Sequence, residues 1–232
     1  MKYPKVSVII STYDRPAMLR RALESLTRQT FRDFEVIVVD DASNTAADVC
    51  KDFEDTLRIS CMSLEKNSGY QSEPKNVGIL HSTGSYIAYL DDDNEYLPHH
   101  LEVCVREIEK MNADAVYTRW RYEGDGPGSG QDSRFVEMNN ITANGLLTSP
   151  MNNFIDTSSI VHSKAAFVGM LGSQVWNQEV RRFGDWELVC RALYASMRLR
   201  CINEVTFVYH WHGKNLQMTR RPNELSTRTV KL

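Results

Sequence analysis

The chain carries three consecutive aspartates, Asp91, Asp92 and Asp93, directly after the strand-like apolar run 86–90. A buried strand that ends in clustered carboxylates gathers repulsive charge at one point, which is costly unless a cation or a cationic ligand offsets it. Carboxylate oxygens are hard ligands that suit Mg²⁺ or Mn²⁺, and proteins commonly share such ions with substrate phosphates. The triplet therefore indicates a divalent metal ion bound to a diphosphate.

Two further polar sites follow predicted strands. Residues 12–15 come after the apolar run 6–10, and they open a predicted helix whose N-terminus offers backbone N–H groups to a phosphate. Asp40 and Asp41 end the run 34–39. We expect Asp40 to cap the following helix and Asp41 to accept a hydrogen bond from a base or a ribose. Ligands of open α/β sheets bind at the C-terminal ends of the strands, so the three sites together predict one nucleotide-binding edge.

Strands and helices alternate through residues 1–111, which predicts right-handed crossovers and a mainly parallel α/β sheet. Residues 112–212 are less regular, and the tail 213–232 is polar and basic, either a lid over the diphosphate or a simple solvated end. No repeat or long linker divides the chain, so we expect a single domain over residues 1–232. The predicted strands are 6–10, 34–39, 57–64, 86–90, 115–122, 155–162 and 205–211, and the predicted helices are 16–26, 49–53, 74–81, 98–111, 164–171 and 186–196.

The composition narrows the class of protein. A chain of 232 residues suffices for one α/β core, and a formal net charge of −3 gives no general attraction to nucleic acid or to an anionic membrane. The apolar runs are far shorter than a membrane span, and the early first strand leaves no room for a signal peptide. The five cysteines are widely spaced and form no CxxC pair, which is typical of reduced thiols in a cytoplasmic protein.

Four segments together resemble family 2 glycosyltransferases of the GT-A fold. They are VSVIISTYDR (6–15), FEVIVVDDAS (34–43), KNVGI (75–79) and YIAYLDDD (86–93), in the usual order and spacing. Within that family, Asp156 before a predicted strand and Asp185 before a predicted helix resemble the spore-coat polysaccharide synthesis type. The resemblance implies a Rossmann-like, mainly parallel sheet with helices on both faces and a smaller acceptor-side sheet.

The same resemblance implies an inverting transfer of a sugar from a nucleoside diphosphate, with a UDP-sugar expected, to a hydroxyl of a glycan or another acceptor. Residues 1–111 would bind the nucleotide sugar and residues 112–212 the acceptor. Asp93 would coordinate Mn²⁺ or Mg²⁺. Lys75 stands where the family commonly has arginine, and its ammonium lacks the bidentate geometry of a guanidinium. The residues implied to lie against the nucleotide are Thr12, Tyr13, Arg15, Asp41, Lys75, Asp91 and Asp92.

Inversion needs a base on the opposite face of the sugar, and Asp185 matches the family's base position. Its alternative role is to cap the helix predicted at 186–196. Trp186, Trp176 and Asp156 are candidates for the sugar or acceptor pocket, although most such aromatic residues pack in a core or at a rim.

The segment His210-Trp211-His212 places two histidines on one face of a predicted strand. One of them is a candidate third metal ligand or diphosphate contact, and His210 is the preferred one. The alternative is a histidine packed at the rim of the sheet.

Two other classes of protein stay open. A sugar-phosphate nucleotidyltransferase also uses acidic metal ligands, but such enzymes usually have a glycine-rich loop after the first strand, and residues 11–16 contain no glycine. A non-catalytic nucleotide-sugar-binding protein would not need Asp185. The sequence leaves the formation of a homodimer open.

Overall fold

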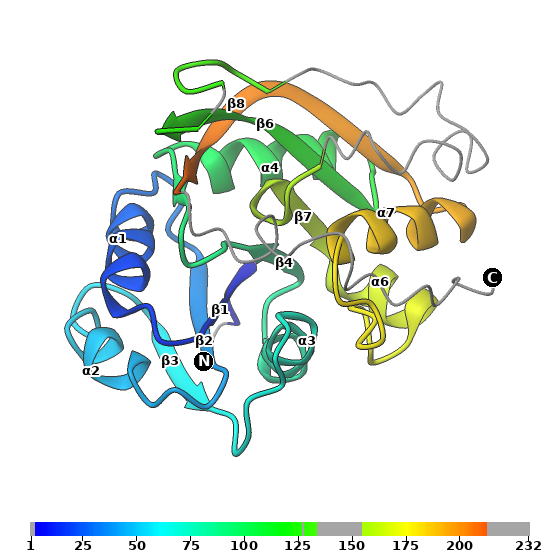
Figure 1. Ribbon diagram of the computed structural model, residues 1–232. Helices are drawn as coiled ribbons and strands as arrows, with labels where there is room; N and C mark the ends of the chain where they lie inside the picture. The colour runs from blue at the N-terminus through cyan, green and yellow to red at the C-terminus, as the bar shows by residue number, and fades with distance from the viewer. Residues whose placement is uncertain (1–2, 127, 134–154, 213–232) are drawn as a thin grey trace.

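Figure 1 shows the fold of the chain in a computed structural model, which describes residues 3–126, 128–133 and 155–212. The helices are α1 (Pro16–Thr27), α2 (Ala46–Lys51), α3 (Ser72–His81), α4 (His100–Lys110), the 3-10 helix η2 (Thr157–Ser159), α6 (Lys164–Leu171) and α7 (Gly184–Tyr194). The strands are β1 (Val6–Thr12), β2 (Phe34–Asp40), β3 (Ile59–Ser63), β4 (Tyr86–Tyr89), β5 (Glu95–Tyr96), β6 (Ala115–Gly124), β7 (Ile160–Ser163) and β8 (Leu199–Trp211).

The strands form one eight-stranded sheet in the order β3-β2-β1-β4-β7-β6-β8-β5. β1 pairs in parallel with β2 and β4, and β2 pairs in parallel with β3, so the first half is a parallel block. β7 runs antiparallel to both β4 and β6, while β8 is parallel to β6. The α/β class is confirmed. The strands expected in a smaller acceptor-side sheet instead continue the central sheet through the pairing of β4 with β7.

Two apolar clusters cover the two faces of the sheet. In β1, Val8 and Ile10 join the cluster formed with α1, α2 and α4, whereas Ile9 joins the cluster formed with α3, α6 and α7 (Figure 1). All three side chains are fully buried. Successive side chains of a strand point to opposite faces, so a strand covered on both faces is apolar at every position. This explains the continuous apolar runs that precede the polar strand ends.

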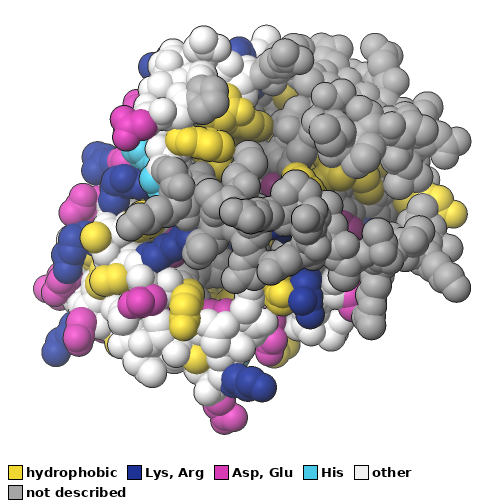
Figure 2. Space-filling model, in the orientation of Figure 1, with side chains coloured by type: hydrophobic (Ala, Val, Ile, Leu, Met, Phe, Trp, Pro, Cys, Tyr) yellow, Lys and Arg dark blue, Asp and Glu magenta, His cyan; other side chains and the backbone are white. Residues whose placement is uncertain are grey.

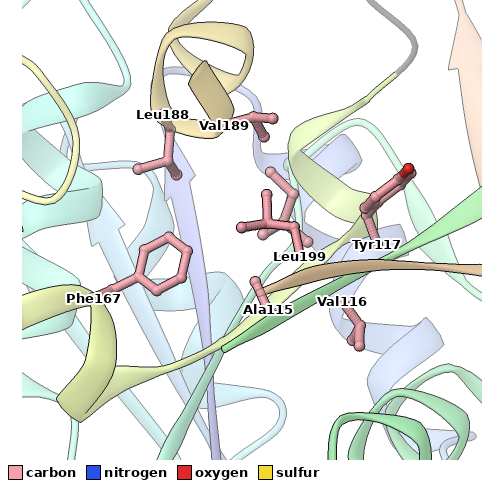
Figure 3. A pocket seen from close by; sticks show the side chains of 8 residues that line it. Ala115, Val116, Tyr117, Phe167, Leu188, Val189 and Leu199 are labelled. Carbon is pink, nitrogen blue, oxygen red and sulfur yellow. The ribbon is translucent and has the colours of Figure 1, made fainter. Parts of the chain in front are cut away.

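The core beneath α7 is nearly filled. A cavity of about 10 Å³ remains between β6, β7, β8, α6 and α7, and apolar side chains line it. Figure 3 shows Phe167, Leu188 and Leu199 around this space. An apolar space this small stays dry. The helix that carries Asp185 therefore packs directly on the sheet.

The surface in Figure 2 carries mixed charge, with acidic and basic side chains intermingled over the part that α1 and α2 occupy in Figure 1. This distribution is consistent with the small formal net charge of −3. Among the residues that the structure describes, no helix combines the length and the apolar character needed to cross a membrane.

Gly84 lets the chain pass close to β1 before β4 begins. A Cβ atom there would lie 2.7 Å from the backbone atoms Ser7 N and Val6 C, and the backbone of a central strand cannot give way. We expect Gly84→Ala to lower the free energy of unfolding by about 2–3 kcal/mol, as overpacked sites do. Gly169→Ala is the control, because nothing lies within 4 Å of its Cβ. Because Gly169 lies inside α6, Gly169→Ala should raise the free energy of unfolding by about 0.5 kcal/mol. Urea denaturation measures both values, and equal stability of the two variants would contradict the predicted clash.

Candidate active site

The triplet Asp91–Asp93 follows β4, at the edge of the sheet where β1 and β2 also end. Parallel pairing of β1 with β2 and β4 brings these three strand ends together, as the sequence predicted. Each carboxylate has a different set of partners. These are Lys75 for Asp91, Thr12 and Arg15 for Asp92, and Arg15 and His212 for Asp93.

Lys75 is a buried cation that holds Asp91. Its Nζ donates to Asp91 Oδ1 at 3.0 Å and to Gln71 Oε1 at 2.5 Å, and it lies 4.5 Å from the ring centroid of Trp176. An ammonium removed from water needs such partners, and the indole face adds a cation–π contact. Lys75 is 0% exposed, and its ammonium is paired with Asp91 at 3.0 Å. The contact with a nucleotide phosphate expected from the sequence stays a prediction.

Asp92 ties the loop after β1 to the end of β4. Thr12 Oγ1 donates to Asp92 Oδ2 at 2.7 Å, and Arg15 donates to Asp92 Oδ1 at 3.1 Å. Burial and then the charge of Asp93 raise the pKa of Asp92 to about 6. Thr12 is buried with it, whereas Tyr13 is 50% exposed. The loop is therefore anchored by one carboxylate and leaves an aromatic ring accessible.

Asp93 lies beside His212, not beside His210. His212 Nε2 is 3.0 Å from Asp93 Oδ2, while His210 Nε2 is 2.8 Å from Glu95 Oε1. The strand β8 pairs with β5 up to Val208, which directs His210 to Glu95 and brings the following turn to the triplet. The structure therefore places His212, and not the preferred His210, beside the expected metal ligand Asp93.

The described residues contain no group of three His, Cys, Asp or Glu side chains arranged to hold a metal ion by themselves. Asp93 and His212 offer one carboxylate and one imidazole, a pair of ligands that suits Mn²⁺. Metal ions of nucleotide sites take their remaining ligands from phosphate oxygens and water. The donor set fits a metal that is shared with a diphosphate, and it does not fit a closed structural site.

Asp41 supports a neighbouring loop. Its carboxylate accepts hydrogen bonds from Ser68 N at 2.7 Å, from Ser68 Oγ at 3.0 Å and from Gly69 N at 3.3 Å. The N-cap residue of α2 is Thr45 and not Asp40, but the Asp40 carboxylate accepts hydrogen bonds from the backbone N–H groups of Thr45 and Ala46 at the start of the helix. Asp41 is also buried, and its contact with a base or a ribose stays a prediction.

Asp156 and Asp185 approach the triplet from the second half of the chain. Asp156 is the N-cap of η2 and accepts from Ser158 N at 2.9 Å. Burial raises the pKa of Asp156 well above its usual value, and the charges of Asp91, Asp185 and Asp93 add to the effect. These acids therefore share one electrostatic neighbourhood, although they come from distant parts of the sequence.

Asp185 lies in the first turn of α7, and Phe183 is the N-cap residue, so the capping alternative for Asp185 is wrong. Asp185 Oδ1 accepts from Trp186 N at 2.8 Å. The partial positive charge of a helix N-terminus stabilises a carboxylate at this position. Phe183 has φ 56°, a left-handed conformation that costs a bulky residue free energy and that concentrates at functional sites. The backbone at Phe183 is therefore strained at the start of α7.

The two tryptophans predicted for an open sugar pocket lie in the core. Trp176 is 0% exposed and packs edge-on against Tyr89 with ring centroids 5.0 Å apart. Trp186 is 8% exposed and belongs to the same apolar cluster. The sequence could not distinguish these two locations, because tryptophan occurs both in apolar cores and in ligand pockets.

Replacing Lys75 by methionine should destabilise the metal-free protein by about 3 kcal/mol at pH 8, because Asp91 then lacks its buried cation. Burial already raises the pKa of Asp91. A carboxyl group whose folded pKa is raised costs stability when it is ionised, so the deficit should shrink as the pH falls toward 5. Thermal unfolding at both pH values measures this change.

Arg20→Met is the matched control, since Arg20 pairs with Asp52 at the exposed surface. Arg20→Met should lower the free energy of unfolding by less than about 1 kcal/mol at both pH values. A Lys75→Met deficit no larger than this control, or one that grows at low pH, would show that Asp91 does not depend on Lys75.

The sequence matches the family model described as glycosyl transferase family 2 over residues 7–168. The chain belongs to glycosyl transferase family 2. It is 30% identical over 215 residues to the uncharacterized glycosyltransferase YwdF of Bacillus subtilis, a match that covers 91% of this chain and 76% of YwdF. This family member is therefore a glycosyltransferase, which decides against the nucleotidyltransferase and the non-catalytic binding protein.

Other relatives are longer. The poly(ribitol-phosphate) beta-N-acetylglucosaminyltransferase TarP of Staphylococcus aureus is 33% identical over 127 residues, which is 53% of this chain and 38% of TarP. A crystal structure of S. aureus TarS with UDP-GlcNAc superposes with a TM-score of 0.76 at 20% identity, and covers 94% of this chain and 61% of that one. At that identity the match shows the GT-A fold alone. The narrower likeness to the spore-coat type stays a prediction.

Proposed function

We propose that this glycosyltransferase transfers a sugar from a nucleoside diphosphate sugar, with a UDP-sugar as the expected donor, to an acceptor hydroxyl with inversion. The observation that carries the proposal is the buried Asp156, whose pKa the charges of Asp91, Asp185 and Asp93 raise. Asp156 is tied to the triplet through Ser158, which donates its N–H to Asp156 Oδ1 at 2.9 Å and accepts from Asp91 N at 3.1 Å. Carboxylates brought together in this way need a cation or a cationic transition state to offset their repulsion. A metal-bound diphosphate beside a developing oxocarbenium ion supplies both.

Residues 1–111 would bind the nucleotide. The half-exposed ring of Tyr13 is available to a base, and Arg15, with 25% of its side chain exposed, is available to a phosphate. Thr12, Asp41, Asp91 and Asp92 would act behind them by holding the loops. The structural neighbour TarS has been solved with UDP and with UDP-GlcNAc, which supports the choice of donor.

Asp93 and His212 would hold Mn²⁺ or Mg²⁺ together with the diphosphate. The metal would supply Lewis acidity that stabilises the charge of the leaving diphosphate. A fold neighbour, the mannosyltransferase PcManGT of Pyrobaculum calidifontis, has been solved with GDP-Man and Mn²⁺ and superposes with a TM-score of 0.66 at 19% identity. Arg15, which reaches Asp92 and Asp93, would keep the triplet compact until the metal and the diphosphate arrive.

Asp185 would take the proton of the acceptor hydroxyl as that oxygen attacks the anomeric carbon. A positioned general base of this kind contributes roughly 10²- to 10⁴-fold to the rate. Inversion has support from the names of two relatives, TarP and a Campylobacter jejuni beta-1,3-glucosyltransferase, since both names state a β-linked product. A β-linked product forms from an α-linked nucleotide sugar in one inverting step.

The acceptor would bind to residues 112–212, which include Asp156 and the first turn of α7. The relatives' names mention a poly(ribitol-phosphate) and a lipid-linked glycan as acceptors, which supports a role in the synthesis of a polysaccharide or another hydroxyl-rich polymer. Residues 134–154 and the basic tail 213–232, expected to be either a lid or a solvated end, lie outside the described residues.

A panel of nucleotide sugars tests the donor. The unfolding temperature should rise with one UDP-sugar in the presence of Mn²⁺, and should rise less with the same ligand in EDTA, because a ligand that binds only the folded state stabilises it by mass action. The proposed donor site would be contradicted if none of the nucleotide sugars raised the unfolding temperature. It would also be contradicted if the rise were equal in Mn²⁺ and in EDTA.

A further inference from the structure

Asn76 connects α3 to the segment that precedes α7. Its side-chain Nδ2 donates to the carbonyl oxygen of Trp176 at 2.7 Å, and Trp176 N donates back to Asn76 Oδ1 at 2.8 Å. Asn76 is 7% exposed and is separated from Trp176 by 100 positions. A buried amide that satisfies both the donor and the acceptor of one distant residue fixes the position and the orientation of that backbone.

The segment 175–177 is bound to α7 on its other side. Arg191 donates to the carbonyl oxygen of Val175 at 2.5 Å, and Asn177 Nδ2 donates to Glu187 Oε1 at 3.2 Å. A Cβ atom at Gly184 would meet the ring of Trp176 at 3.6 Å, so the first residue of α7 already packs against it. Any displacement of this segment would therefore move the N-terminus of α7.

The same turn of α3 holds the triplet. Lys75, next to Asn76, pairs with Asp91 at 3.0 Å and stacks on the ring of Trp176. One helix thus fixes the first aspartate of the triplet with one residue and the approach to α7 with the next. The distance between the donor-side aspartates and Asp185 is set through α3 and not through the sheet alone.

From these contacts we propose that Asn76 is a positioning residue that sets the place of Asp185 relative to the donor sugar. The inference rests on the proposed role of Asp185 as base. It gives a function to a residue that touches neither the nucleotide site nor the acceptor. A base displaced by about 1 Å loses on the order of 100-fold in rate, because the reacting atoms no longer meet in line.

A simple role in satisfying buried backbone groups is the competing explanation, and Gln29 provides the matched control. Gln29 is fully buried, its Nε2 donates to the carbonyl oxygen of Leu97 at 2.8 Å, and Leu101 N donates to its Oε1 at 3.1 Å. Its amide thus also bonds to backbone groups of a distant segment, but to two residues around the start of α4, and its Nε2 additionally donates to Ser25 O at 3.4 Å. Gln29→Ala and Asn76→Ala remove similar hydrogen bonds in different places.

We expect both variants to unfold at similarly reduced temperatures. Asn76→Ala should lower kcat for release of nucleoside diphosphate about 10- to 100-fold with the Kd for UDP and Mn²⁺ nearly unchanged, while Gln29→Ala should keep kcat within about twofold of wild type. If Asn76→Ala folds and loses no more kcat than Gln29→Ala, or if it loses UDP affinity instead, the positioning role is wrong.

A double-mutant cycle with Asp185→Asn separates this inference from the proposed function. If Asn76 acts through Asp185, adding Asn76→Ala to Asp185→Asn should change the residual kcat less than about twofold. An unchanged 10- to 100-fold loss in that background would overturn the inference and leave the base intact. A fully active Asp185→Asn enzyme would instead overturn the base, whatever Asn76→Ala does.

Discussion

Asp185→Asn is expected to lower turnover about a thousandfold, within the range measured for general bases, and to leave the Kd for the nucleoside diphosphate nearly unchanged. The amide has the size of the carboxylate and can still accept from Trp186 N, so α7 should keep its first turn. It cannot accept a proton at neutral pH. The kcat for release of nucleoside diphosphate and a calorimetric titration with UDP measure the two quantities.

Asp48→Asn is the matched control, because Asp48 is an acid in the first turn of α2 and is exposed. It removes the same favourable contact with a helix N-terminus, worth about 0.3–1 kcal/mol, away from the proposed site. Its turnover should equal that of the wild type. The base assignment would fail if Asp185→Asn turned over at the control rate.

Asp93→Ala is expected to abolish the response to Mn²⁺ and to lower turnover about 100- to 1000-fold, since the leaving diphosphate loses several kcal/mol of charge stabilisation. The variant should still fold, because it also relieves the repulsion with Asp92. UDP should bind it with the same affinity in Mn²⁺ and in EDTA. Calorimetric titration and metal-dependent turnover provide the measurements.

Asp52→Ala is the comparison for Asp93→Ala, since Asp52, the residue that follows α2, forms an exposed ion pair with Arg20 of α1. It should bind UDP and Mn²⁺ as the wild type does. Retained metal-dependent binding in Asp93→Ala would show that Asp93 is not the metal ligand. His212→Ala should weaken the metal response less than Asp93→Ala, because an imidazole contributes no negative charge to the site.

The first half of the fold and its polar edge could be predicted because the signals are local. Apolar runs covered on both faces are continuous, and the polar residues that follow them mark the strand ends, so the positions of Asp40, Asp41 and the triplet followed directly from the sequence. The contact of Asp40 with the start of α2 could be predicted for the same reason, since its partners Thr45 and Ala46 follow closely in the chain, although Thr45 is the N-cap residue.

The second half could be predicted less well because long-range pairing decides it. The register of β8 against β5 brings His212 and not His210 to Asp93, and a shift of two residues along a strand leaves no trace in the alternation pattern. Trp176 gave no local sign of burial, because its environment is made by Tyr89 and Lys75. Asn76 was visible only as part of a family segment, and its partner lies 100 positions away.

The products formed from a nucleotide sugar test the central claim most directly. Incubation of the enzyme with the UDP-sugar that stabilises it, Mn²⁺ and a hydroxyl acceptor or water should release UDP, because the bond between the anomeric carbon and oxygen breaks. The Asp185→Asn variant should release almost none. Release of sugar 1-phosphate in place of UDP, or no product from any nucleotide sugar that binds, would contradict the account.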